Sequence, residues 1–335
     1  MSEIKMDLPP LEERPLVTFA LFAYNQEKYI REAVEGAFAQ TYQPLEIILS
    51  DDCSMDNTHA IMCEMASEYH GPHTLIVNRS QSNRGLGAHI REVSNMSRGS
   101  IIVLAAGDDI SCDSRTKLIV ESFLSAENIC AVFSDMKIID EYSECIQFNS
   151  KSWSEGEKID LLMLIRRGGG IGPGASYAYR RECFFWPWKL PEFIISEDRL
   201  LPFRAKCLGD ICYIPKATVS YRIIKESLSR KLIRMNKLAF QDRDHLDELS
   251  NTINAARSQG YLDRKLERVT LRALGQMPKY AELIRKDSEL GGLGLVDRLV
   301  YNWIVRDTLF KRINERLLRR LRTIEIREIL PHKNQ

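Results

Sequence analysis

The fold is decided by one stretch, residues 17–58, which reads VTFALFAYNQEKYIREAVEGAFAQTYQPLEIILSDDCSMDNT. Two apolar runs in it, VTFALFA from Val17 and EIILS from Glu46, flank a segment that is predicted to be helical from Lys28 to Ala39. Neither run alternates apolar and polar residues, and nearly continuous apolar runs are typical of parallel strands covered on both faces. The stretch therefore predicts a strand, a helix and a second, parallel strand.

The same pattern repeats further along the chain. Strand-like runs start at Thr74 (TLIVN) and Ile101 (IIVLA), and helical segments are predicted at 58–69 and 86–96. The four strand starts are 29, 28 and 27 residues apart, close to the length of one strand–helix unit. Parallel neighbours require helical crossovers, and right-handed crossovers produce a doubly wound sheet. Residues 16–135 are therefore predicted to form an α/β fold with a mostly parallel sheet.

The pattern changes after residue 135. Short strand-like runs then mix with a glycine-rich stretch at 168–174 and an aromatic cluster, FFWPW, at 184–188, which predicts an α+β extension. From residue 231 helix-forming residues dominate and proline is almost absent, which predicts a helical C-terminal appendage. The expected divisions are a flexible N-terminus (1–14), an α/β half (15–135), an α+β half (136–230) and a helical C-terminal region (231–335).

Composition excludes several classes of protein. The 47 Lys and Arg residues balance 46 Asp and Glu residues. The protein is therefore not strongly basic, and it is not expected to bind nucleic acid through its overall charge. No apolar run approaches the roughly 18 residues of a membrane span, and the N-terminus lacks the apolar core of a signal peptide. The eight cysteines show no C-x-x-C spacing. This favours reduced, mostly buried thiols in a cytoplasmic protein over a zinc site or a disulfide scaffold.

The C-terminal region contains one amphipathic segment with a basic bias. Residues 298–327 hold nine Lys or Arg and three Asp or Glu, a local net charge of +6. Such a helix suits two roles: packing within the molecule or against a second copy, and peripheral contact with an anionic membrane surface. The sequence leaves both open. The apolar stripe lies within residues 299–324 and consists of Phe310, Ile313, Leu317, Leu321 and Ile324, which recur at helical spacing.

Two acidic pairs directly follow predicted strands. Asp51 and Asp52 come after the second strand, and Asp108 and Asp109 come after the fourth. In an open parallel sheet, ligands bind at the carboxyl ends of the strands, where a carboxylate can accept hydrogen bonds from a nucleoside or hold a divalent cation. Adjacent like charges repel, so such a pair needs a cation or a donor-rich partner to stay ionised. The alternative is structural, because Asp commonly caps the turns and helices that follow strands.

A third acidic pair, Glu197 and Asp198, lies where an apolar run enters a helical pattern, in FIISEDRLLPFRA. The pair is either catalytic, or it follows an N-cap at Ser196 and favours the positive end of the helix dipole. The glycine-rich run GGGIGPGAS at 168–176 lacks the spacing of a phosphate-binding P-loop. It is either a flexible loop or a place where the backbone packs closely beside a substrate.

Taken in order, these residues resemble the family 2 glycosyltransferases, which have the GT-A fold. The family typically shows Pro-Thr-Tyr-Asn, a helix, a Gln-Thr segment leading to Glu-Ile-Ile, and then Asp-Asp-x-Ser-x-Asp-x-Thr. The resemblance covers roughly residues 15–225, and Phe22 and Ala23 replace the usual Pro and Thr. The residues that match in order are Tyr24, Asn25, Gln40, Thr41, Glu46, Asp51, Asp52, Ser54, Asp56 and Thr58.

The resemblance implies roles for individual residues. Asn83-Arg84-Gly85 is similar to the family's Asn-x-Gly segment, and Gly107-Asp108-Asp109 is similar to its metal-binding Asp-x-Asp region. Ala106 stands where the family often has its first Asp, and Ile224 replaces a His that can be a metal ligand. The implied roles are nucleotide binding for Ala23, Tyr24, Asn25, Asp51, Asp52, Arg84 and Asp108; binding of Mg²⁺ or Mn²⁺ for Asp109 and Asp108; the acceptor side for Gly172, Gly174, Ala175, Ser176 and Glu197; and the general base for Asp198.

The activity that the resemblance implies is transfer of a hexose or related sugar, with inversion, from a nucleotide-diphosphate sugar to an acceptor hydroxyl. The acceptor expected from the family is a glycan or a lipid-linked glycan, as in bacterial surface-glycan assembly. A homo-oligomer and a peripheral position on the inner face of the membrane are compatible with this function. Two rivals stay open: a nucleotidyltransferase that makes the sugar nucleotide, and a non-catalytic protein that only binds it. A nucleotidyltransferase usually has a Gly-rich loop after its first strand, whereas this sequence has AYNQEKY there.

Overall fold

The computed structural model describes residues 8–150, 159–166, 171–192, 194, 197–224 and 243–262. The chain divides into two units, residues 1–279 and 280–335, and every described residue lies in the first. The amphipathic segment at 299–324, the N-cap at Ser196 and the start of the glycine-rich run at 168–170 lie outside the described residues. A short 3₁₀ helix, η1 (Leu11–Glu13), precedes the sheet.

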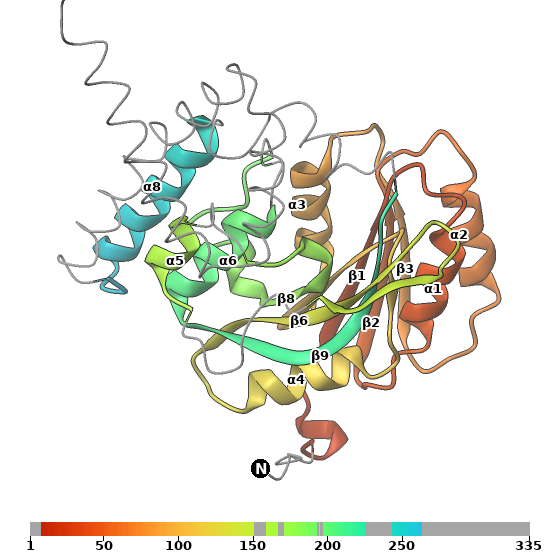
Figure 1. The fold of residues 1–335 in the computed structure, drawn as a ribbon, viewed down its shortest axis with the longest axis horizontal. Coiled ribbons are helices and arrows are strands. Elements are labelled where there is room, and N and C mark those ends of the chain that lie inside the picture. Colours follow the sequence, from red (N-terminus) through yellow and green to blue (C-terminus); the bar gives the residue numbers. More distant parts are fainter. Residues whose placement is uncertain are drawn as a thin grey trace, which may run out of the picture. The chain divides into compact units, whose positions relative to one another are not determined.

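The first half of the chain forms the predicted parallel sheet. Each predicted strand and helix is present within one or two residues of its expected ends, and the strand order β3-β2-β1-β4 is that of a doubly wound α/β fold (Figure 1). The prediction of an α/β fold is therefore confirmed. The elements are β1 (Val17–Ala23), α1 (Ile30–Phe38), β2 (Leu45–Asp51), α2 (Thr58–Ser67), β3 (Thr74–Arg79), α3 (Leu86–Met96) and β4 (Ile101–Ala106).

The second half extends this sheet instead of forming a separate one. Along the described residues the sheet has nine strands in the order β3-β2-β1-β4-β8-β6-β9-β5, with β7 paired to β6. Strand β8 is antiparallel to both β4 and β6, whereas β6 and β9 are parallel. The added elements are β5 (Ile110–Ser111), α4 (Arg115–Leu124), β6 (Ile129–Ile139), β7 (Cys145–Ser150), α5 (Leu161–Arg166), η2 (Gly174–Ser176), β8 (Tyr177–Arg180), η3 (Arg181–Phe184), α6 (Glu197–Leu208), β9 (Asp210–Arg222) and α8 (Arg243–Ser258).

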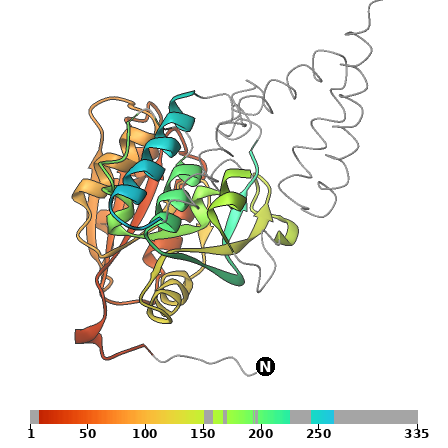
Figure 2. The same ribbon diagram turned by 90° about the vertical axis from the view of Figure 1, so that its left-hand side faces the viewer.

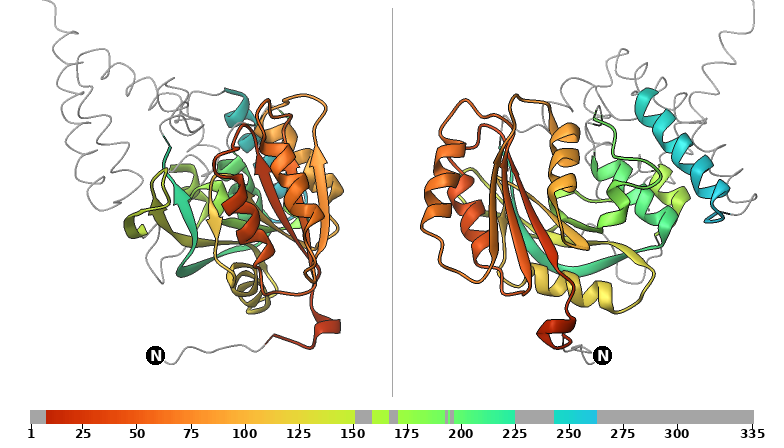
Figure 3. Two further views of the ribbon diagram at one scale, coloured as in Figure 1. Left: turned by 90° about the vertical axis from the view of Figure 1, so that its right-hand side faces the viewer. Right: turned by 180° about the vertical axis from the view of Figure 1, so that it is seen from behind.

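Helices cover both faces of the sheet. Helices α1, α2 and α4 pack on one face, against side chains such as Phe19 and Leu21 of β1. Helices α3, α5 and α6 pack on the other, against Ala20 and Phe22 of the same strand (Figures 1 and 3). Successive residues of a strand point to opposite faces, so burial on both sides explains why the strand is apolar at nearly every position.

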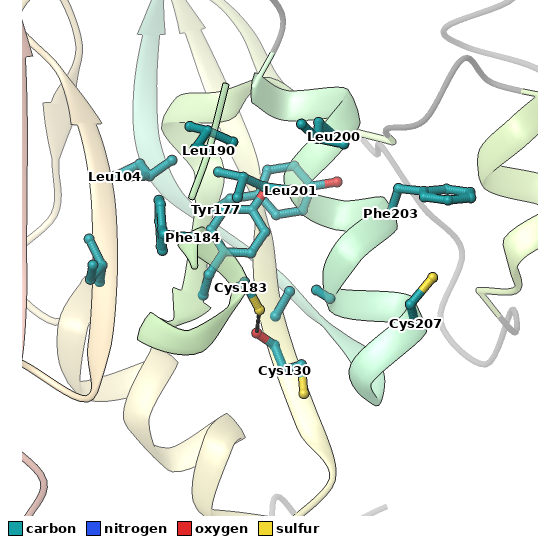
Figure 4. Packing of buried hydrophobic residues seen from close by; sticks show 14 of the residues in the cluster. Leu104, Cys130, Tyr177, Cys183, Phe184, Leu190, Leu200, Leu201, Phe203 and Cys207 are labelled. Carbon is teal, nitrogen blue, oxygen red and sulfur yellow. Dashed lines mark hydrogen bonds between the residues drawn. The ribbon is translucent and has the colours of Figure 1, made fainter. Parts of the chain in front are cut away.

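The layer that contains α6 has its own aromatic and aliphatic core. Tyr177 of β8 and Phe184 of η3 pack against Leu200 and Leu201 of α6 (Figure 4). Helix α8 lies against α6 (Figure 2). A buried ion pair joins the two helices, with 2.8 Å between Arg204 Nη2 and Glu248 Oε1. The amino end of α6, which begins at Glu197, is therefore supported by both the sheet and α8.

Glu46 and Gln40, two polar residues of the stretch that resembles the family, are buried and stabilise the fold. Glu46 accepts hydrogen bonds from Thr18 Oγ1 (2.5 Å), from the backbone N–H of Arg98 (2.7 Å) and from Arg98 Nε (2.8 Å). Gln40 donates to the carbonyl oxygen of Cys112 (2.7 Å) and accepts from Thr116 Oγ1 (2.7 Å). Each residue thus joins segments that are far apart along the chain: Glu46 binds Arg98, and Gln40 binds Cys112 and Thr116.

The cysteines differ in burial, and the expectation that they are mostly buried holds for only three of the eight. All eight cysteines are unpaired; Cys130, Cys183 and Cys207 are buried, Cys63 is exposed and the other four are partly buried. No helix within the described ranges is both long and apolar enough to cross a membrane.

Candidate functional site

The ends of three neighbouring strands meet at one edge of the sheet. Ala23 pairs with Asp51 at the ends of β1 and β2, and Phe22 pairs with Ala106 at the end of β4. Just beyond β2 and β4 the backbone is still hydrogen-bonded to β1. The N–H of Asp52 donates to the carbonyl oxygen of Ala23 (2.9 Å), and the N–H of Gly107 donates to the carbonyl oxygen of Phe22 (2.8 Å). The first two acidic pairs therefore emerge at the same carboxyl edge, on either side of β1.

Asp51 and Asp52 are both buried and both hold neighbouring loops. The Asp51 carboxylate accepts hydrogen bonds from the N–H (2.9 Å) and the hydroxyl of Ser54, and Arg79 Nε lies 3.5 Å from it. The Asp52 carboxylate accepts from the backbone N–H groups of Arg84 (3.1 Å) and Gly85 (3.0 Å). These are the contacts of turn-forming residues, and they fix the loops that border the edge.

The residues after β1 form a turn that is tied to the loop after β2. Asn25 has a left-handed backbone, with φ of 52°, a conformation that Asn adopts more readily than most residues. Its N–H donates to Ser54 Oγ (2.8 Å), and its Oδ1 accepts from the N–H of Met55 (2.9 Å). Tyr24 is left 43% exposed at the edge, so its ring is accessible to a ligand.

Arg84 links the edge to the segment that precedes α6. Its guanidinium forms ion pairs with Glu192 (3.0 Å) and, more loosely, with Glu92 (3.9 Å). At Gly87, in the first turn of α3, an added Cβ would collide with the carbonyl oxygen of Ile194. The stretch that leads to the third acidic pair is therefore packed directly against the loop that Asp52 holds.

Asp109 is buried with one of its two carboxylate oxygens unsatisfied. Its Oδ1 accepts a hydrogen bond from the N–H of Arg222 (2.8 Å), whereas its Oδ2 has no hydrogen-bond partner among the described residues. Burial, and next the charge of Asp108, raise the pKa of Asp109 well above its usual value. Burial also raises the pKa of Asp108, against an opposing hydrogen bond from Gln26.

These two carboxyl groups fit a divalent cation. A hard dication prefers oxygen ligands, and it would offset both the burial and the mutual repulsion that disfavour the charged forms. Within the described ranges no cluster of three or more His, Cys, Asp or Glu side chains is suited to a metal ion. Protein ligands from this part of the chain would therefore be limited to Asp108 and Asp109, with other oxygens from a ligand or water. Neither Ala106 nor Ile224 carries a ligating side chain.

Glu197 and Asp198 form the first turn of α6 and pack against η2. An added Cβ at Gly174 would collide with Glu197 Oε1, so the backbone of the glycine-rich run packs closely against the Glu197 carboxyl group at this position. Burial and then the charge of Asp198 raise the pKa of Glu197 to about 8, against the helix N–H groups, which lower it. Burial also raises the pKa of Asp198. Glu197 is 8% exposed, whereas Asp198 is only partly buried and is thus the more accessible of the two.

Three residues that sequence reasoning did not assign complete the site. Arg222 is buried, donates from Nε to the carbonyl of Asp108 (2.8 Å) and lies over the Tyr29 ring at 4.7 Å. Tyr179 has a buried hydroxyl without a partner among the described residues, and Glu197 and Asp198 are among the charges near it. The third is Arg115, which is fully buried. Arg222 lies two residues before Ile224, which replaces the family's His, so its position near that segment was a signal. No local feature of the sequence distinguishes Arg115 or Tyr179.

The acidic ends of the site are connected through Arg115. Its Nη2 donates to the carbonyl oxygen of Ala175 (2.6 Å), next to Gly174, and its charge acts on Asp109. Arg115 therefore connects the segment that packs on Glu197 with the surroundings of Asp109, and the convergence of Asp51, Asp109 and Asp198 in one site stays a prediction. Gly172 and Ser176 lie in the same segment as Ala175, and Ser176 Oγ donates to the carbonyl of Pro173 (2.8 Å).

Comparison with known proteins identifies what the chain is similar to. The family model described as Glycosyl transferase family 2 matches residues 18–185, half of the chain. The succinoglycan biosynthesis protein ExoO of Rhizobium meliloti is 25% identical over 276 residues, which cover 78% of this chain and 78% of that protein.

Two solved structures share the fold. One is the S. aureus TarS fragment 1–349 in complex with UDP-GlcNAc, with a TM-score of 0.53, 15% identity and coverage of 82% of this chain and 92% of that one. The other is the mannosyltransferase PcManGT from Pyrobaculum calidifontis in complex with GDP-Man and Mn²⁺, with a TM-score of 0.56, 17% identity and coverage of 88% and 85%. The GT-A-like fold expected from the sequence is therefore confirmed.

Proposed function

The chain belongs to glycosyl transferase family 2, and we propose that it transfers a hexose or related sugar, with inversion, from a nucleotide-diphosphate sugar to an acceptor hydroxyl. The observation that supports the proposal is the unsatisfied, buried carboxylate oxygen of Asp109, in a chain whose Asp198 is only partly buried. A cation-binding group and a proton acceptor at one edge are what this reaction requires.

In this proposal the donor binds at the ends of β1, β2 and β4. The half-exposed ring of Tyr24 offers a surface for the base, and the Arg84 guanidinium can pair with the diphosphate. Asp51 and Asp52 hold the surrounding loops through the contacts described above, and the nucleoside would bind beside them. The donor side is thus residues 15–135, with Ala23 and Asn25 at its rim, and residues 136–230 form the acceptor side.

Asp108 and Asp109 would hold Mg²⁺ or Mn²⁺, with Asp109 as the more direct ligand. When bound, the cation supplies Lewis-acid stabilisation of the charge that develops on the departing diphosphate. The unsatisfied Asp109 oxygen and the raised pKa of both carboxyl groups support this assignment. Arg222 fixes the turn, since it binds the carbonyl of Asp108 and, through its own N–H, the carboxylate of Asp109.

Asp198 is proposed as the general base. The acceptor oxygen forms a bond to the anomeric carbon while its proton passes to Asp198, and the bond to the nucleotide diphosphate breaks on the opposite face. One such displacement inverts the anomeric centre, and a single carboxylate is sufficient because the diphosphate leaves without a proton. Glu197 is proton-bound at neutral pH, because its pKa is raised to about 8. Asp198 therefore has no ionised neighbour to repel its own charge.

The acceptor is proposed to be a glycan or lipid-linked glycan in bacterial surface-polysaccharide assembly, on the cytoplasmic side of the membrane. The similarity to a succinoglycan biosynthesis protein supports this class of acceptor. The basic segment 299–324 would then either contact the membrane surface or pack within the protein or a homo-oligomer. Liposome co-sedimentation of the full chain, compared with a chain that ends at residue 295, distinguishes the two roles.

The proposal is tested by a thermal-shift screen of nucleotide-diphosphate sugars with Mn²⁺, followed by assay of slow donor hydrolysis. A bound donor raises the melting temperature by mass action. Asp198→Asn is expected to lower turnover by at least about 10²-fold with nearly unchanged donor affinity, whereas Asp109→Asn is expected to weaken Mn²⁺-dependent binding. Donor binding without any turnover would favour the non-catalytic alternative, and unchanged turnover in Asp198→Asn would remove that residue from the mechanism.

A further inference from the structure

Arg115, in the first turn of α4, is a fully buried arginine that lies between the two acidic ends of the site. An arginine keeps its charge at physiological pH, and a buried charge is tolerated only when it is paired and hydrogen-bonded. The neighbours that compensate Arg115 therefore indicate which parts of the molecule it holds in place.

The hydrogen bonds of Arg115 join the two halves of the site. Its Nη2 donates to the carbonyl oxygen of Leu104 in β4 (2.8 Å) and to that of Ala175 in η2 (2.6 Å). Strand β4 leads into the Asp108–Asp109 turn, and η2 is the segment on which the Glu197 carboxyl group packs. One nitrogen atom thus connects the strand that ends in the cation ligands with the support of the proposed base.

The charge of Arg115 faces the cation side. Its Nη1 donates to Ser111 Oγ (2.9 Å), just beyond the Asp108–Asp109 turn. Burial lowers the pKa of Arg115 to about 10, and the charges of Cys112 and Asp109 oppose that effect. Arg115 in turn favours the charged form of Asp109. The guanidinium is therefore a buried positive charge, fixed beside Ser111, whose field reaches the Asp109 carboxyl group.

We propose that Arg115 is a positioning residue that sets the separation between the Asp108–Asp109 cation ligands and the acceptor-side segment supporting Asp198. This role rests on the proposed function, because it assumes that Asp109 binds a cation. Arg115 has two separable effects: hydrogen bonds hold residues 171–179, and the positive charge moderates the affinity of the carboxylates for the metal. A residue needed only for folding would not show the second effect.

Hydrogen exchange measured by mass spectrometry on the full chain tests the hydrogen-bonding part. Arg115→Lys has a shorter side chain and a single nitrogen, which does not replace the bonds to Ser111, Leu104 and Ala175 together. Amides in 171–179, including the Ser176 N–H bonded to Pro173, are therefore expected to exchange at least about 10-fold faster. The matched control is Arg180→Lys, because Arg180 binds the carbonyls of Ile129 and Glu127 at the other end of β8. Exchange in 171–176 is expected to be unchanged in this control.

Calorimetric titration with Mn²⁺ alone at pH 8.0 tests the charge part. Arg115→Gln removes the repulsion between the guanidinium and the cation, so we expect about 3- to 30-fold tighter Mn²⁺ binding. Arg115→Lys is expected to bind Mn²⁺ no more tightly than Arg115→Gln, because a buried ammonium keeps at most the charge of the guanidinium and loses its proton more readily. A variant that is merely less well folded would bind the ion more weakly.

The outcomes separate the role of Arg115 from the function itself. Unchanged exchange in Arg115→Lys, or unchanged or weaker Mn²⁺ binding in a folded Arg115→Gln protein, would overturn the positioning role. If the unmodified protein does not bind Mn²⁺, and Asp109→Asn behaves identically, then the cation site is wrong. In that case faster exchange of residues 171–179 in Arg115→Lys would still show that Arg115 stabilises this segment. Unchanged exchange in that variant would refute the stabilisation as well.

Discussion

Glu197 has an environment very different from that of an ordinary surface acid. It lies beneath Gly174 and beside Asp198, and burial followed by the Asp198 charge raises its pKa from 4.5 to about 8. At neutral pH the folded protein therefore holds a proton that the unfolded chain has released. Such a neutral acid next to a charged one is a common arrangement where two carboxyl groups have different tasks.

This shift predicts how stability depends on pH. Between pH 4.5 and about 8 the folded state binds the extra proton, so the free energy of unfolding falls as pH rises through this window. Glu197→Gln removes the titration, and its stability relative to the unmodified protein is expected to rise by up to a few kcal/mol from pH 5 to pH 8, at about 1.36 kcal/mol per pKa unit. Urea unfolding at several pH values measures this difference, and a pH-independent difference would contradict the assigned environment.

Glu46 provides a control of opposite sign. Burial acts to raise its pKa, but the hydrogen bonds from Thr18 and Arg98 outweigh burial and lower it below 4.5. Its contribution to stability is therefore present above pH 4.5 and is lost as pH falls. Glu46→Gln is expected to be destabilised at pH 7, and this deficit is expected to shrink toward acidic pH, whereas the advantage of Glu197→Gln grows toward alkaline pH.

At the residue level the sequence identified the acids but not their counter-charges. An Asp that follows a strand, or a Glu-Asp pair at the start of a helix, is recognisable because the carboxyl edge of a parallel sheet is where ligands bind. Arg115 reads as an ordinary residue in the first turn of a helix. Its partners Leu104 and Ala175 come from distant segments, so only the folded structure reveals its role.

At the level of elements, α6 is important because its first turn carries Glu197 and Asp198. Its far side is tied to α8 by the Arg204–Glu248 ion pair, in which the two side chains are 0% and 6% exposed. Glu248 also accepts a hydrogen bond from Trp188 Nε1 (2.9 Å). Removal of one partner of a buried pair leaves an uncompensated charge, which is far costlier than losing an exposed pair.

Glu248→Ala is therefore expected to destabilise the protein by about 3–5 kcal/mol. The matched control is Glu64→Ala, which removes the Arg31–Glu64 pair, where both side chains are at least half exposed; its expected effect is at most about 1 kcal/mol. Denaturant unfolding of both variants measures the comparison. An equal decrease in the free energy of unfolding of the two variants would show that the buried Arg204–Glu248 pair stabilises the protein no more than the exposed pair does.

The elements themselves were predictable only where their contacts are local. The strand and helix ends of residues 17–106 follow from continuous apolar runs and helical spacing, because each crossover joins neighbouring parallel strands. Strand β8 has four residues, Tyr177–Arg180, and pairs with β4 and β6 in antiparallel registers. No periodicity within four residues specifies those partners, so the order β4-β8-β6-β9 could not be deduced from the sequence.

At the level of the whole described structure, one sheet carries both halves of the site. Strand β6 crosses the expected boundary at residue 135 without interruption, and β8 lies directly beside β4. The strands of residues 15–135 and of residues 136–230 are therefore neighbours in a single sheet.

The claim that Asp108 and Asp109 form a cation site next to Asp198 is tested most directly by anomalous scattering at the manganese edge. The measurement uses crystals of the full chain grown with Mn²⁺ and a nucleoside diphosphate. We predict one strong peak about 2.1 Å from Asp109 Oδ2, on the side of the sheet that carries Asp198. A peak at another place, or a bound nucleotide with no manganese beside Asp109, would contradict the account.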